Sequence, residues 1–120
     1  MNPRKKQRTE ESLRRELSSI ILYELKDPRM GFVTLTGVEI SQDCRSAKVR
    51  LLVRGTEEET ALTLQGLQHA RGYIQALINK RMDLRYTPIL QFEEDKEVRR
   101  VMRVQQMIDK ARKEDREYRP

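Results

Sequence analysis

The sequence predicts a single α+β domain in which helices pack on one face of a three-stranded sheet. Apolar residues recur at helical spacing within residues 13–25 and 64–78, and at alternate positions within residues 33–40, 47–53 and 90–92. A chain of 120 residues, 37% of them hydrophobic, suits one domain with one modest core. The expected order is therefore helix, strand, strand, helix, a second helix after a kink, and a third strand.

The N-terminal part predicts an amphipathic helix. The helix should end before Pro28, because proline disfavours helical geometry at the preceding Asp27. Asp27 is interpreted as a turn residue whose carboxylate accepts backbone amides, and Gly31 permits the turn into the next element. The apolar residues of this helix share one face: Leu13, Leu17, Ile20, Ile21 and Leu25.

The first two strands are expected to form an antiparallel hairpin. Val33 and Leu35 alternate with threonines, whereas Val38 and Ile40 continue the alternation on the opposite parity. A β-bulge at Thr36–Gly37 would correct this slip of one residue. The second strand has its apolar residues at alternate positions: Ala47, Val49, Leu51 and Val53.

The following helical stretch contains a break. Thr56 and Glu59 have the spacing of a capping box, which predicts that a helix begins there. Helical spacing of apolar residues then continues from Leu64 to Ile78 across the segment Ala70-Arg71-Gly72. Glycine inside a helix costs roughly 1 kcal/mol relative to alanine, so Gly72 indicates a kink or a close approach by another group.

The C-terminal part predicts one more strand and a charged tail. Pro88 is tolerated at the start of a strand, where a missing amide matters least, and Leu90 and Phe92 form a buried pair at period two. Beyond Asp95 the sequence has only a thin apolar stripe. We expect a marginal helix that frays into disorder, because little apolar area offsets the entropy of ordering it.

Charge and composition restrict the class of function. Lysine and arginine total 25 against 19 acidic residues, a net charge of +6, which favours a polyanionic partner such as nucleic acid or an anionic membrane surface. Cys44 is the only cysteine, so an intramolecular disulfide is excluded, and we interpret it as a small core or turn residue. The basic N-terminus is followed by polar residues where a signal peptide needs an apolar segment, so we expect a cytoplasmic protein.

The kink is the candidate site for nucleic-acid backbone. The second half-helix would present its positive dipole end there, and small residues at Ala70 and Gly72 would let a phosphate approach while Arg71 reaches it. Two alternatives stay open: close packing of helix on sheet explains small residues, and a solvated face explains the cations. The candidate RNA-binding residues are Ala70, Arg71, Gly72, Lys80, Arg81, Arg85, Arg4, Lys5, Lys6 and Arg8.

Enzymatic function is not indicated by any recognisable motif. His69 is a lone histidine beside the kink, interpreted as a surface or capping residue. A nucleophile, a base and an orienting group do not occur together, and glycine-rich phosphate loops and metal-ligand spacings are absent from the sequence. We therefore expect no catalytic residues, no cofactor, no metal and no small-molecule substrate.

Five segments in this order resemble one family: Lys26-Asp27-Pro28-Arg29, Val33 to Ser41, Ala47-Lys48-Val49, Ala70-Arg71-Gly72-Tyr73-Ile74, and Leu84 to Phe92. The chain resembles the bacterial ribosome-binding factor A family from about Arg8 to about Ile108. The resemblance implies a type II KH-like domain in which Ala70-Arg71-Gly72 replaces the usual Gly-x-x-Gly loop. It also implies a role in late maturation of the 30S small ribosomal subunit, including 16S rRNA processing and growth in the cold.

The residues and the resemblance together predict an assembly factor that binds the immature 30S subunit and 16S rRNA. Residues 1–8 are expected to form a flexible basic arm, residues 9–96 the KH-like RNA-binding domain, and residues 97–120 a charged tail that is helical or disordered. We expect a monomer and no membrane association. The alternative is a general nucleic-acid-binding KH module without specificity for the ribosome, and a more distant one is a protein-interaction domain that uses the charged tail.

Overall fold

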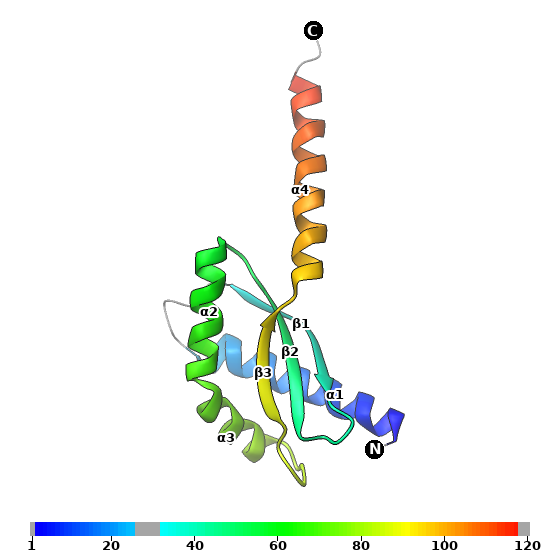
Figure 1. Cartoon of the computed structure of the whole chain (residues 1–120), viewed down its shortest axis with the longest axis vertical. Helices are drawn as coiled ribbons and strands as arrows, with labels where there is room; N and C mark the ends of the chain where they lie inside the picture. Colours follow the sequence, from blue (N-terminus) through cyan, green and yellow to red (C-terminus); the bar gives the residue numbers. More distant parts are fainter. Residues whose placement is uncertain (1, 26–31, 118–120) are drawn as a thin grey trace.

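The computed structural model describes residues 2–25 and 32–117. The predicted order of elements is confirmed, with a fourth helix at the C-terminal end (Figure 1). The predicted turn around Lys26-Asp27-Pro28-Arg29 lies outside the described residues. The elements are α1 (Pro3–Ser19), a π-helical turn (Ile20–Glu24), β1 (Val33–Ile40), β2 (Ser46–Val53), α2 (Glu57–His69), α3 (Arg71–Arg81), β3 (Ile89–Glu94) and α4 (Lys96–Glu117).

The three strands form one mixed sheet in the order β1-β2-β3. β1 and β2 pair antiparallel as the predicted hairpin, whereas β3 lies parallel to β2. The predicted bulge is confirmed, because Leu35 pairs with Leu51 and Gly37 pairs with the next residue, Arg50, which leaves Thr36 as the extra residue. The bulge lets Leu35 and Ile40 both face the core despite their opposite parity.

The core lies between one face of the sheet and α1, α2 and α3. α1 crosses behind the strands in Figure 1, and α2 and α3 follow the β3 side. The structure therefore confirms a type II KH-like α+β domain with these helices on one sheet face. The fully buried members of the core come from every layer: Leu13, Leu17, Ile20, Ala47, Val49, Leu51, Leu67, Ile74, Ile78 and Leu90.

The helix α1 begins earlier than the sequence analysis expected. Asn2 is its N-cap, and the side-chain Oδ1 of Asn2 accepts a hydrogen bond of 2.9 Å from the Arg4 amide. Pro3 occupies the first helical position, where its fixed φ and missing N–H suit a helix start. Residues 3–8, which were expected to belong to a flexible arm, are helical in the structure.

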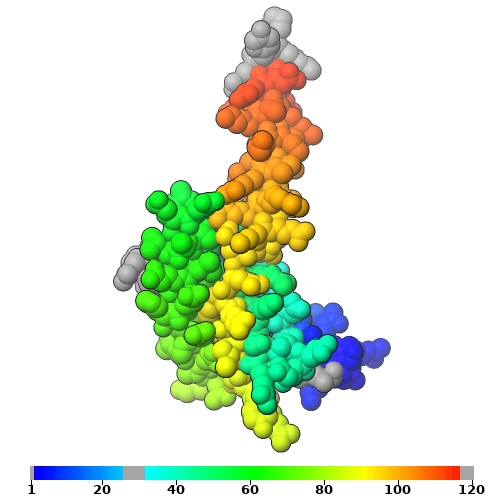
Figure 2. Space-filling view, viewed as in Figure 1, coloured from blue at the N-terminus to red at the C-terminus, as the bar shows by residue number. Residues whose placement is uncertain are grey.

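The helix α4 projects away from the domain, as the space-filling view shows (Figure 2). The molecule consequently measures 66 Å along its longest axis and 34 Å along the next. The apolar stripe of α4 includes Val101, Val104 and Ile108, all exposed. Within residues 2–25 and 32–117, we find no helix with the length and apolar character needed to cross a membrane.

Candidate nucleic-acid interface

The predicted kink is a single residue, Ala70. α2 starts at the predicted cap, where the Glu59 amide donates to the Thr56 hydroxyl at 3.2 Å. At the other end, the Ala70 amide donates to the Gly66 carbonyl at 3.0 Å, and the Ala70 carbonyl accepts from the Ile74 amide at 2.9 Å. Ala70 thus closes α2 and opens α3. The start of α3 has no side-chain cap in the described part of the chain.

The two small residues of the kink have different surroundings. Ala70 is half-buried and packs against the core, so close packing accounts for its small size. Gly72 is exposed, and a Cβ added there would meet nothing within 4 Å. The Gly72 backbone also has an ordinary negative φ. The fold does not require glycine at this position, and the surface above it is open to a close approach.

Arg71 lies beside the kink and reaches toward β3. Its Nη1 donates a long hydrogen bond of 3.5 Å to the Leu90 carbonyl. The Arg71 residue is nevertheless exposed. Because a guanidinium has five N–H donors, the remaining ones can still bind an anion at the kink.

The cations at the far end of α3 differ in how much of their charge is neutralised. Arg81 forms ion pairs with Glu24 and with Glu16, the latter at 3.7 Å between Nη1 and Oε2. Lys80 is exposed, and Arg85 lies in the following loop with its guanidinium 5.7 Å from the centre of the Tyr86 ring. Arg81 thus ties α3 to the end of α1, whereas Lys80 and Arg85 face solvent.

The structure brings one N-terminal cation next to α3. Arg8 and Arg81 line a shallow groove of about 360 Å³ between α1 and the end of α3. Arg4 and Lys5 lie on the first turn of α1 and are exposed, and Lys6 forms an ion pair with Glu10 at 3.9 Å. The N-terminal cations are therefore held on a helix rather than on a free arm.

The predicted residues do not form one continuous basic patch. Arg71 and Arg81 stand at opposite ends of α3, about 15 Å apart at 1.5 Å per residue. Lys80 follows Arg71 by nine residues, which places it on the opposite side of the helix. The structure thus separates a kink site at residues 70–72 from the groove lined by Arg8 and Arg81, whose charges are balanced there by Glu16 and Asp83.

Two residues of α3 that the sequence analysis did not single out contact the segment leading into β3. The Gln75 side chain donates to the Pro88 carbonyl and accepts from the Leu90 amide, both at 3.2 Å. Asn79 accepts from the Thr87 hydroxyl at 3.0 Å. Arg71, Gln75 and Asn79 are spaced four residues apart, so they form a polar row along one face of α3. The four-residue spacing of these polar residues is the sequence pattern that could have predicted the row.

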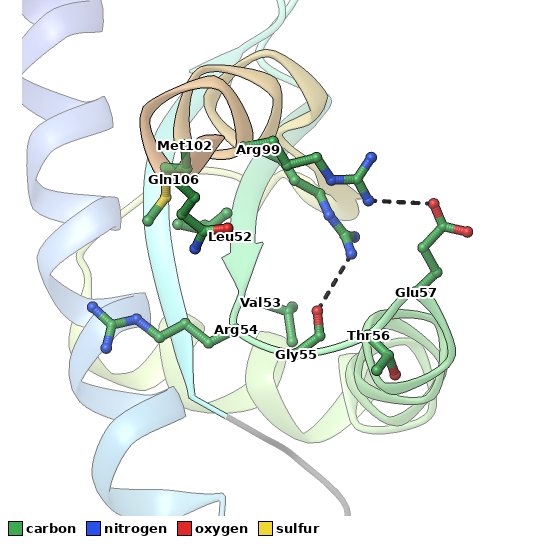
Figure 3. A pocket seen from close by; sticks show the side chains of 10 residues that line it. Leu52, Val53, Arg54, Gly55, Thr56, Glu57, Arg99, Met102 and Gln106 are labelled. Carbon is green, nitrogen blue, oxygen red and sulfur yellow. Dashed lines mark hydrogen bonds and ion pairs between the residues drawn. The ribbon is translucent and has the colours of Figure 1, made fainter. Parts of the chain in front are cut away.

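A cavity of about 580 Å³ lies away from the kink, where α4 passes the C-terminal end of β2 and the start of α2 (Figure 3). Arg99 donates to the Gly55 carbonyl at 3.4 Å, and Arg103 donates to Glu57 at 3.4 Å. Arg99 also forms an ion pair with Glu94. These arginines are used to attach α4 to the domain.

Cysteine, histidine and acidic side chains form no metal site in the part of the chain that the structure describes. In the described ranges, no group of three or more His, Cys, Asp or Glu side chains could hold a metal ion. Cys44 lies in the turn between β1 and β2 with a φ of 59°, and it packs against the core. His69 is exposed at the end of α2.

The fold and the open kink define this chain as a small protein of the type II KH-like class. The family model for ribosome-binding factor A matches residues 5–108. A ribosome-binding factor A of Thioalkalivibrio sulfidiphilus is 45% identical over 121 residues, covering 98% of this chain and 94% of that protein. The chain belongs to the ribosome-binding factor A family.

Solved structures agree with this assignment. The crystal structure of ribosome-binding factor A from Thermus thermophilus superposes with a TM-score of 0.67 at 29% identity, covering 74% of this chain and 93% of that one. A homology model of the Thermus thermophilus factor, fitted into a cryo-EM map of its complex with 30S, gives a TM-score of 0.59 at 29% identity. It covers 69% of this chain and 87% of that one.

Proposed function

We propose that this protein is a ribosome assembly factor that binds the immature 30S subunit and assists late maturation and processing of 16S rRNA, including in the cold. Family membership supports the role, and a Thermus thermophilus relative has been placed in a 30S complex. The observation that supports the kink as the binding site is that Gly72 is exposed and that neither packing nor backbone geometry requires a glycine there.

The kink would bind the ribose-phosphate backbone of rRNA. The first amides of α3 point away from the helix body and carry the positive end of its dipole, which attracts a phosphate. Absence of a side chain at Gly72 lets that phosphate approach closely, and Arg71 adds charge-assisted hydrogen bonds from the side. Lys80 and Arg85, together with Arg8 and the first turn of α1, would contact other phosphates of the rRNA, at a distance from the one at the kink.

The factor would act by occupancy rather than by chemistry. A protein that binds one rRNA conformation more tightly than another shifts the population toward it by the difference in binding free energy. We propose a cytoplasmic, non-enzymatic, monomeric factor that leaves once the preferred conformation is complete. The alternative is a general nucleic-acid-binding KH module, which the +6 charge would also suit.

Co-sedimentation distinguishes the two functions. The purified protein would be mixed with immature 30S, mature 30S, 50S and bulk RNA near physiological salt, where unspecific attraction is partly screened. The assembly factor pellets with immature 30S in preference to the other three. Equal binding to all four would favour the general module.

A charge-matched pair of variants tests the kink. Gly72→Asp places a negative side chain where the phosphate would sit, whereas Ala61→Asp adds the same charge at an exposed position of α2. We expect Gly72→Asp to weaken 30S binding by roughly tenfold or more, the effect of losing one or two charge-assisted hydrogen bonds, with Ala61→Asp close to wild type. If the two variants bind alike while both remain folded by circular dichroism, the kink is not the contact.

A further inference from the structure

Arg71 and Gln75, two residues of the polar row, hydrogen-bond to main-chain groups at the edge of β3 and the residue before it. β3 is an outer strand of the sheet. The Ile89 amide donates inward to the Arg45 carbonyl of the neighbouring segment at 2.9 Å, so the next residue, Leu90, presents its main-chain groups outward. Those outward groups are the ones that α3 covers.

The closure is specific in its chemistry. The Gln75 carboxamide offers one acceptor and one donor, which match the Leu90 amide and the Pro88 carbonyl at 3.2 Å each. The Arg71 guanidinium donates a hydrogen bond of 3.5 Å to the Leu90 carbonyl. Three successive polar groups of the strand edge beside the kink are therefore hydrogen-bonded to side chains of α3.

An open strand edge is a site where another molecule can pair. Its unpaired amides and carbonyls bind peptide strands, and an adjacent donor and acceptor also match the Watson–Crick edge of an unstacked nucleobase. A base arriving next to a phosphate held at the kink would meet this stretch of β3. In this chain it would meet the Gln75 carboxamide already in place.

We propose that Gln75 closes the β3 edge to nucleobases, so that the kink binds RNA backbone without reading base identity. This inference rests on the proposed function, since it concerns what the kink reads once RNA is bound. Gln75 is a specificity-determining residue under this proposal. A protein that must recognise one folded region of rRNA then depends on the shape of the backbone, because the base-reading groups nearest the kink are occupied.

The first experiment uses the unmodified protein. Binding of an oligouridylate is compared with that of the same oligomer built from N3-methyluridine, in which a methyl group blocks the Watson–Crick edge while the ring can still stack. We expect the two affinities to agree within about threefold, less than the effect of one hydrogen bond to a base. A loss of about tenfold or more on methylation would overturn the proposal.

The second experiment follows individual amides by NMR during the oligouridylate titration. The Gly72 and Tyr73 amides should shift, and the Leu90 amide should keep both its position and its protection from hydrogen exchange. If the kink amides do not respond to any oligomer, the proposed function fails at this site. If the Leu90 amide shifts together with the kink amides, RNA binds at the kink, but the proposal that Gln75 closes the β3 edge is wrong.

The variant that tests Gln75 is Gln75→Ala, with Gln65→Ala as the matched control at an exposed position of α2. Removing the carboxamide exposes the Leu90 amide and the Pro88 carbonyl. Discrimination between the two oligomers should rise to about fivefold or more in Gln75→Ala only. A Gln75→Ala protein that folds but binds both oligomers equally would contradict the role of Gln75. Should it not fold, the two wild-type measurements still decide the proposal.

Discussion

The hydroxyl of Thr36 donates a hydrogen bond of 2.7 Å to the carboxylate of Asp95, although the two residues are 59 positions apart in the chain. Thr36 is the extra residue of the β1 bulge, and Asp95 is the last residue before α4. The other Asp95 oxygen accepts from the Val98 amide at 3.1 Å, and the Asp95 amide donates to the Leu51 carbonyl at 2.8 Å. The bulge therefore fixes the point from which α4 leaves the sheet.

Replacing either member of this pair should lower stability, and Asp95→Ala should lower it more than Thr36→Val. Asp95→Ala removes both the hydrogen bond to Thr36 and the cap of α4, whereas Thr36→Val removes only the first. Urea unfolding of the two single variants and the double variant measures this. The double variant should be about as stable as Asp95→Ala alone, because both changes remove the same bond. Strictly additive losses would contradict the coupling.

The same pair predicts a dependence of stability on pH. The hydroxyl of Thr36, then the amide of Val98, lower the pKa of Asp95 below its usual value. A carboxylate with a lowered folded-state pKa stabilises the protein above its unfolded-state pKa, about 3.9, and that stabilisation is lost as the pH falls through the folded-state pKa. The stability difference between wild type and Asp95→Asn should thus be constant near neutral pH and shrink in acid. A difference independent of pH down to acid unfolding would count against this.

Local patterns explain why so much of the fold could be predicted. The phase slip between Leu35 and Val38 predicted the bulge, and the spacing of Thr56 and Glu59 predicted the start of α2, because each feature depends on neighbours in the sequence. The start of α1 was also encoded locally, by Asn2 before Pro3, and was missed because the basic run suggested a solvated arm.

The parts that could not be predicted are side-chain pairs between distant segments. Arg81 is a candidate RNA-binding residue in the sequence, but in the structure it forms ion pairs with Glu16 and Glu24, more than fifty residues earlier. Gln75 could not be predicted as a contact residue, because the Pro88 carbonyl and the Leu90 amide come next to it only when α3 packs beside β3. A pattern of apolar residues fixes which elements pack together and leaves open which polar side chains then meet.

Gly72→Ala should separate stability from binding at the kink. Alanine is favoured over glycine in a helix by about 0.5–1 kcal/mol, and a Cβ at Gly72 meets nothing within 4 Å, so the variant should be at least as stable as wild type. Its affinity for immature 30S should fall, because the methyl group holds the backbone phosphate away. Thermal unfolding and co-sedimentation measure the two effects. A destabilised variant would mean that the glycine has a structural role.

Gly55→Ala should have the opposite effect on stability. Gly55 has a φ of 139°, and a Cβ there would lie 2.3 Å from Oε2 of Glu59. We expect a loss of about 1–3 kcal/mol in the free energy of unfolding, the usual cost of holding a residue with a side chain in such a conformation. Gly37→Ala is the control. A Cβ added at Gly37 would meet nothing within 4 Å, and the Gly37 backbone does not have the positive φ that disfavours a side chain. Equal stability of the two variants would contradict the conclusion that the conformation at Gly55 requires glycine.

Removing a carboxylate beside Arg81 should increase affinity for RNA. Glu16→Gln leaves the Arg81 guanidinium with one paired carboxylate, Glu24. The groove, in which Arg8 and Arg81 are balanced by Glu16 and Asp83, then gains a net positive charge. Because the groove is open to solvent, the gain should be modest, roughly twofold to fivefold at low salt, and should shrink as salt screens it. Filter binding to 16S rRNA at two salt concentrations measures this. Glu114→Gln on the projecting helix makes the same charge change away from the groove. An equal gain from both variants would show only the effect of overall charge, whereas a gain confined to Glu16→Gln would place rRNA at the groove.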